Sequence, residues 1–145
     1  MLRRAVLLGA AVWGLAACDQ HKIAKLEEGV ATEADVRREF GNPAAVFDEP
    51  GGARTLEYPR QPEGQTNYFI TIGGDGKMSS LRQVLKDDSF VRIKPGLDKA
   101  EVRRLLGRPA KVQPYPLKQQ EDWDWRFLDG AQAQQFTASF DAQGR

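Results

Sequence analysis

Apolar and polar residues alternate with a period of two in four short segments of the chain, a pattern typical of half-buried β-strands. In the segment 122–128, Trp123, Trp125 and Phe127 fall on one face, while Asp124 falls on the other. The same alternation occurs in the segments 55–60, 67–72 and 135–140. We therefore expect antiparallel strands, each with one buried face.

Two Asp-Gly pairs, Asp75-Gly76 and Asp129-Gly130, predict tight turns between these strands. After the first pair, residues 77–88 are consistent with a further strand in which Met78 and Val84 are available for burial. In the second half the sequence reaches Arg145 where an equivalent strand would begin. The second sheet is therefore expected either to borrow an edge strand from the first half or to end in an open edge.

A helical pattern occurs twice, in residues 29–43 and 96–109, and the two copies align at a constant offset of 66 from a shared Val-Arg-Arg triplet onward. Each copy has two apolar residues spaced four apart on one face, a capping box before them, and a glycine and a proline after them. The apolar pairs are Val36 with Phe40 and Val102 with Leu106, and the expected capping boxes are Thr32 with Asp35 and Asp98 with Glu101.

The helix and strand patterns together divide the chain into two similar units, residues 25–86 and 87–145, joined by a short polar linker around Lys86 to Ser89. The expected fold class is α+β, with short helices packed on a small antiparallel sheet in each unit. A unit of about 60 residues is only marginally stable alone. We therefore expect the two units to pack together around an enlarged core.

The N-terminal residues 1–17 have the layout of a secretory signal peptide. Two arginines precede Ala5–Ala17, an uncharged and mostly apolar run that is shorter than the roughly 20 residues needed to span a bilayer. Removing Arg3 and Arg4 with this segment leaves 19 basic residues against 20 acidic ones. This balance argues against nucleic acid as a partner, because such binding depends on a dense basic surface.

Cys18 is the only cysteine of the chain, and it follows directly after the apolar run. Leu15, Ala16, Ala17 and Cys18 resemble the lipobox of bacterial lipoproteins, which implies lipidation of the Cys18 thiol and anchoring of the chain to a membrane by several acyl chains. Residues 18–24 would then form a lipidated tether. The alternative is an ordinary signal peptide, cut near Ala17, that leaves a thiol at the new terminus.

The two residues after the cysteine bear on sorting between membranes. Asp19 resembles the signal that retains lipoproteins in the inner membrane of enteric bacteria, and Gln20 is compatible with it. An inner-membrane location is therefore an alternative to the outer membrane.

The second copy resembles the SmpA/OmlA family, which includes the outer membrane assembly factor BamE. The family pattern has an aliphatic residue and a glycine before a capped helix, a Leu-Gly-x-Pro exit, an aromatic-x-aromatic strand and a Phe-Asp-x-x-Gly turn. The matching residues are Val91, Ile93, Gly96, Leu106, Gly107, Pro109, Trp123, Trp125, Phe140, Asp141 and Gly144. The first copy matches more loosely, and the duplication also resembles the tandem arrangement of the β-lactamase-inhibitor protein fold.

The resemblance implies a lipid-anchored, periplasm-facing lipoprotein of the cell envelope, with the outer membrane as the favoured location. It implies a non-enzymatic role in outer membrane protein assembly or envelope integrity, exerted through contacts with envelope proteins, among them the β-barrel assembly machine. The alternative is a periplasmic inhibitor or ligand-binding module of the β-lactamase-inhibitor type, suggested by the tandem layout.

Catalytic chemistry and a metal site are not expected. His21 is the only histidine, so the chain has no Cys/His metal set and no histidine placed to activate a serine in the predicted strands. Pairs of adjacent acidic residues in polar segments are typical of solvated surfaces. We therefore expect no enzyme activity and no cofactor.

Three segments rich in proline, glycine or polar residues are the expected contact surfaces: residues 48–54, 60–66 and 113–120. The pair Trp123 and Trp125 has two interpretations. Alternation with charged residues favours a buried strand face, whereas tryptophan is also frequent at the centre of protein interfaces.

Overall fold

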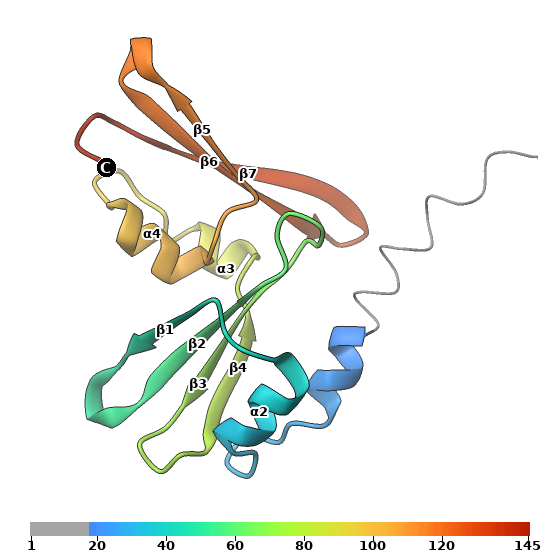
Figure 1. The fold of residues 1–145 in the computed structure, drawn as a ribbon. Coiled ribbons are helices and arrows are strands. Elements are labelled where there is room, and N and C mark those ends of the chain that lie inside the picture. The colour runs from blue at the N-terminus through green and yellow to red at the C-terminus, as the bar shows by residue number, and fades with distance from the viewer. Residues whose placement is uncertain (1–17) are drawn as a thin grey trace, which may run out of the picture.

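The computed structural model describes residues 18–145, so the signal peptide expected at 1–17 lies outside the described residues. Two small antiparallel sheets and a few short helices confirm the expected α+β class (Figure 1). The first sheet has the strand order β1-β2-β3-β4 and the second has the order β5-β6-β7. The strands are β1 (Ala45–Asp48), β2 (Arg54–Pro59), β3 (Asn67–Ile72), β4 (Met78–Gln83), β5 (Lys111–Tyr115), β6 (Gln120–Asp129) and β7 (Gln132–Phe140).

The two longer helices begin and end as the sequence predicts. In α2 (Glu33–Phe40) and α4 (Lys99–Leu106), the capping boxes of Thr32 with Asp35 and of Asp98 with Glu101 are both formed. Each box satisfies N–H groups that have no partner within the first helical turn. A glycine with positive φ follows each helix, where a side chain would be strained.

One core lies between α2 and one face of the first sheet. It contains Val36 and Phe40 of the helix together with residues of β2, β3 and β4, among them Leu56, Ile70 and Met78. Ile23 and Leu26, close to the N-terminus of the described chain, pack against it. The even-numbered apolar residues of β2 and β3 therefore serve this core.

The second core lies on the other side of the first sheet and joins the two halves of the molecule. Phe69 of β3 and Val84 and Leu85 after β4 are buried in it together with Val102 and Trp125. Helix α4 thus lies between the two sheets, and Figure 1 shows the second sheet above it and the first sheet below it. The expected packing of the two halves around a shared core is present in this form.

Four features differ from the expectations. The central strands β2 and β3 are buried on both faces and not on one, because the first core covers one side of their sheet and the second core covers the other. Strands β1 and β5 lie in segments for which the sequence predicted no strand. Each is an edge strand: β1 pairs with β2 in the first sheet, and β5 pairs with β6 in the second. The polar linker at Lys86 to Ser89 largely coincides with a short helix, α3 (Asp87–Phe90). Phe90 anchors that helix, since its ring stacks on Phe136 of β7 with centroids 4.5 Å apart.

Candidate functional site: an exposed hairpin tip

The residues after Cys18 are folded onto the first half of the molecule. Residues 18–24, expected to be a tether, are helical, and Cys18 itself is exposed. Asp19 is only 5% exposed, and both oxygens of its carboxylate accept hydrogen bonds from the Arg60 guanidinium, at 2.9 and 3.1 Å. A bidentate arginine–carboxylate pair of this kind fixes geometry as well as charge.

Arg60 also connects this helix to the first core, because its guanidinium carbon lies 5.4 Å from the centroid of the Phe40 ring. Gln20 and His21 are both exposed. The structure thus separates the two residues considered for sorting: Gln20 lies at the surface, whereas Asp19 is buried in an ion pair. Its partner, 41 positions further along the chain, could not be found from the sequence.

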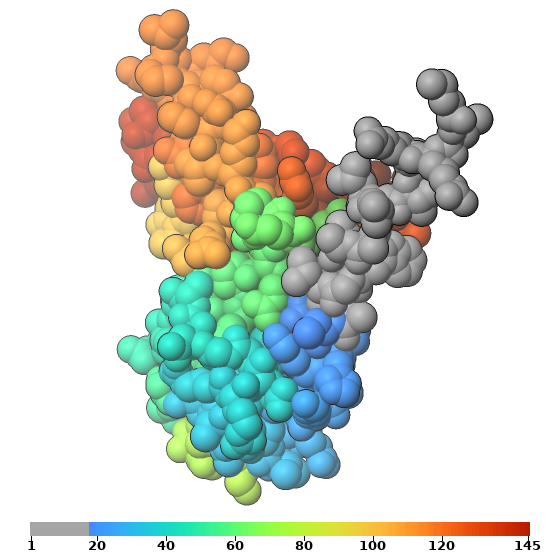
Figure 2. All heavy atoms as spheres, turned by 45° about the vertical axis from the view of Figure 1, so that its right-hand side comes forward, coloured from blue at the N-terminus to red at the C-terminus, as the bar shows by residue number. Residues whose placement is uncertain are grey.

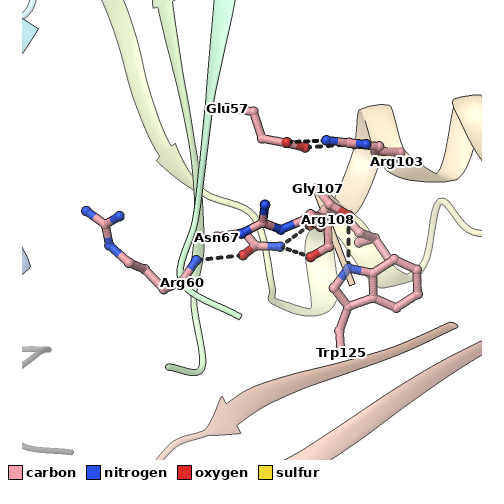
Figure 3. Close-up of polar contacts among 8 residues, drawn as sticks. Glu57, Arg60, Asn67, Arg103, Gly107, Arg108 and Trp125 are labelled. Carbon is pink, nitrogen blue, oxygen red and sulfur yellow. Dashed lines mark hydrogen bonds and ion pairs between the residues drawn. The ribbon is translucent and has the colours of Figure 1, made fainter. Parts of the chain in front are cut away.

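The junction between the two halves is held by buried polar contacts (Figure 3). The Asn67 side chain, fully buried, donates to the carbonyl oxygens of Leu106 and Arg108 at 2.8 and 3.0 Å, and accepts from the Arg60 backbone N–H at 3.1 Å. The Trp125 indole N–H donates to the Gly107 carbonyl at 3.0 Å. These bonds satisfy carbonyl groups at the end of α4 that have no partner within the helix.

An ion pair lies beside these hydrogen bonds. Glu57 of β2 is fully buried, and its carboxylate accepts from Arg103 of α4 at 2.7 and 3.3 Å. The hydrogen bonds that Arg103 donates to Glu57 raise the pKa of the Arg103 guanidinium, which therefore stays charged. This pair explains why a glutamate can occupy the buried face of the first sheet.

Two of the three expected contact segments form hydrogen bonds with other parts of the same chain. In 48–54, Glu49 accepts hydrogen bonds from Thr55 and from Arg104 of α4, and the bond from Arg104 lowers the pKa of Glu49. In 60–66, Gln61 and Arg126 exchange two hydrogen bonds, at 2.8 and 2.9 Å, which join this loop to β6. Both segments therefore stabilise the fold.

The third segment, 113–120, presents apolar side chains to solvent. It contains the end of β5, the single turn η2 (Pro116–Lys118) and the start of β6. Leu117 is fully exposed, and Tyr115 is 40% exposed, with the Lys118 ammonium 5.7 Å from its ring centroid. We call residues 115–118 the hairpin tip. Figures 1 and 2 show it projecting from the top of the molecule, away from the helix of residues 18–24.

The two strand tryptophans are part of the second core, as the alternation with charged residues predicted. Trp125 is fully buried, and Trp123 packs partly buried against it and against Phe140. The Trp123 indole N–H donates to Glu121 at 2.7 Å, and this bond is the main cause that lowers the pKa of that carboxyl. The tryptophans therefore belong to the second core and are not part of the hairpin tip.

The remaining surface features of residues 18–145 are modest. Two open hollows have volumes of about 250 and 320 Å³; the first is lined in part by Leu26, Val30 and Arg38, and the second in part by Gln65 and Gln135. Within the described residues no group of three or more His, Cys, Asp or Glu side chains could hold a metal ion. No helix in this part of the chain combines the length and the apolar character needed to cross a membrane.

Comparison with known proteins gives a distant structural likeness. No protein-family model and no curated protein matches the chain. It is similar to a solved structure of a DUF4309 family protein (YjgB) from Bacillus subtilis subsp. subtilis str. 168, with 18% sequence identity over 82% of this chain and 76% of that chain and a TM-score of 0.34. Similarity at this level identifies neither a family nor a function.

Proposed function

We propose that the chain is a lipid-anchored, periplasm-facing lipoprotein of the bacterial cell envelope that acts by binding other envelope proteins. The observation that carries the binding role is the hairpin tip. Leu117 and Tyr115 are both exposed within one projecting turn, and tyrosine is enriched among the residues that contribute most to protein interfaces.

The lipid anchor is proposed from the lipobox-like residues that end at Cys18, and it is supported by the exposure of the thiol. The outer membrane is the location we favour. Its support is the ion pair between Asp19 and Arg60, since a carboxylate enclosed in the folded protein is a poor surface for sorting factors to read.

We place the two halves in the SmpA/OmlA class as tandem BamE-like units. The support is that each half has a capped helix followed by three antiparallel strands, with α2 before β1–β3 and α4 before β5–β7. In this proposal the partners are envelope proteins such as the β-barrel assembly machine.

The test is site-specific photocrosslinking of the full-length chain in its native membranes. A photoreactive residue replaces Leu117 in one variant and, in the control, Val91, an aliphatic residue that is 68% exposed elsewhere on the surface. We expect a distinct crosslinked protein at position 117 and none at position 91, with mass spectrometry identifying an envelope protein. Equal crosslinking at both positions, or none at 117, would refute the binding role.

A second variant tests the anchor separately. Cys18→Ser removes the thiol that would carry the lipid, so the chain is expected to move from the membrane fraction to the soluble fraction. If the parent chain is itself soluble and its N-terminal peptide carries no lipid by mass spectrometry, the anchor is wrong even if the hairpin tip binds a protein.

A further inference from the structure

The outer edge of β7 has no backbone partner within the described structure. Within residues 18–145, β6 is the strand that pairs with β7, and no backbone group outside this sheet bonds to Gln132–Phe140. The pairing with β6 continues through nine residues without a bulge. At the usual rise per residue, this edge is about 30 Å long and presents a row of backbone donors and acceptors.

The other three edges are protected in ways that natural proteins commonly use against pairing. Strand β1 has four residues, and β5 carries Lys111 and the imino acid Pro114. Strand β4 carries Arg82, has a register shift opposite Thr71, and is covered at its start by backbone bonds between Met78 and residues 29–31.

Strand β7 has none of these protections. Its sequence, QAQQFTASF, contains no charged residue, no proline and no glycine. In the first sheet the corresponding place beside β3 is filled by β4, which pairs with it antiparallel. The second sheet therefore has the geometry to accept one more antiparallel strand, and its edge carries no feature that would repel one.

We propose that the β7 edge pairs antiparallel with the β7 edge of a second copy of this chain, so that two second sheets join into one six-stranded sheet. Two-fold antiparallel pairing places β7 residues opposite β7 residues, and this strand suits such pairing because it is uncharged throughout. On the outer face, glutamine, threonine and serine of one copy would face the same residue types of the other. If this face carried charged residues, two-fold pairing would bring like charges opposite each other, which is unfavourable.

The pairing is also continuous with the existing core. In an antiparallel pair the facing residues lie on the same side of the sheet. The inner residues Phe136, Ala138 and Phe140 of each copy would therefore lie on the side of the sheet that carries α4, where they already belong to the second core. This proposal does not depend on the lipid anchor or on the hairpin tip.

The test is a disulfide scan of the full-length protein in the cells that produce it, whether the chain is found in their membrane or soluble fraction. One cysteine at a time is added to the parent chain, on the outer face of β7 at Ala133, Gln135, Thr137 or Ser139, or at Gln113 of β5 as the control edge. Facing positions of antiparallel strands bring Cβ atoms within about 5.5 Å, close enough for oxidation to a disulfide. The parent chain, which retains Cys18, shows the background.

Two-fold pairing predicts a homodimer disulfide that is strongest at the one or two β7 positions nearest the symmetry axis and weaker at positions further from it. The Gln113→Cys control should stay at background. Equal yields on β5 and β7, no dimer at any β7 position, or an adduct with a protein of different mass would each overturn the proposal of a second copy.

A charge exchange gives an independent readout. Gln135→Lys and Gln135→Glu, or the same two changes at Thr137 when position 135 carries the cysteine, each place like charges along the paired edges, so each alone should lower the disulfide yield at the best β7 position by about fivefold or more. Co-expression of the two variants should restore the yield, because opposite charges then face each other. If co-expression restores nothing although both variants are folded by circular dichroism, the two edges do not pair.

Discussion

At the scale of single residues, Asn67 is the polar side chain on which the junction between the two halves most depends. Replacement by alanine leaves the carbonyl groups of Leu106 and Arg108 and the N–H of Arg60 without this partner. Because these groups are buried or partly buried, we expect Asn67→Ala to lower the free energy of unfolding by about 2–4 kcal/mol.

Urea denaturation of the parent chain and of Asn67→Ala measures this loss of unfolding free energy. Asn42→Ala is the matched control, since Asn42 is exposed and its one contact with Arg37 has a length of 3.5 Å. That variant should differ from the parent by less than about 0.5 kcal/mol. Equal losses in the two variants would contradict the role assigned to Asn67.

Glu49 predicts a pH-dependent contribution to stability. Its pKa is lowered in the folded protein, chiefly by the hydrogen bond from Arg104, so the ionised form is favoured by folding. The contribution is therefore complete above the ordinary glutamate pKa of about 4.3 and is lost as the pH falls through the lower pKa of the folded state. Glu49→Gln should cost up to about 1 kcal/mol at neutral pH.

Thermal melts of the parent chain and of Glu49→Gln, recorded at a series of acidic pH values, give the difference in melting temperature. The difference in melting temperature should shrink as the pH falls below about 4.3, because the parent then loses the same ion pair. A difference that stays constant down to the acid limit would show that Glu49 acts through packing rather than charge.

The residue scale also shows which contacts a sequence can predict. Both capping boxes were predictable because cap and partner are three residues apart and the geometry is local. Asn67 and Arg60 were not, since their partners lie about 40 positions away along the chain. An asparagine at the start of a strand has no local signal that indicates which carbonyl groups it will meet.

At the scale of elements, the helix of residues 18–24 depends on one ion pair and a few apolar contacts. Arg60→Gln removes the charge that faces the buried Asp19 carboxylate. A buried charge without its partner is unfavourable, so we expect the helix to detach and the amide hydrogens of residues 18–26 to exchange at least about tenfold faster.

Hydrogen exchange measured by mass spectrometry tests this expectation. Arg38→Gln breaks an exposed pair with Asp35 and serves as the control. Exchange in β2 and β3 should remain slow in both variants. Unchanged protection of residues 18–26 in Arg60→Gln would mean that Ile23 and Leu26 hold the segment without the ion pair.

Element prediction succeeded where the residue pattern was strong. The strands β2, β3, β6 and β7 all alternate clearly, and all four are present. Strand β1 has only four residues, and β5 contains a proline and two exposed hydrophobic residues, so neither has a pattern of its own. These two strands form because a longer neighbouring strand supplies their hydrogen-bond partners. That neighbour is known only from the tertiary structure, so the segment's own sequence does not predict the strand.

At the scale of the whole molecule, the second core makes the two halves interdependent. Phe69, Val84 and Leu85 belong to the first half of the chain but are buried against Trp125 and α4. The second sheet therefore has no complete core without the first half. We expect the described chain to unfold in one cooperative transition.

Two probes can show this. Tryptophan fluorescence reports mainly on Trp123 and Trp125 in the second half, whereas far-ultraviolet circular dichroism reports on both halves. The denaturation midpoints from the two probes should coincide. Two separated transitions would mean that the halves are stable as independent domains.

The docked helix of residues 18–24 also sets a distance. Seven extended residues could reach about 24 Å, whereas the same residues in a helix cover about 10 Å and are here fastened to the first half. A lipid on Cys18 would therefore hold the protein close against the bilayer with almost no slack. Because the hairpin tip projects away from the helix of residues 18–24 (Figure 1), such an anchor would leave the tip uncovered while confining its contacts to partners near the same membrane.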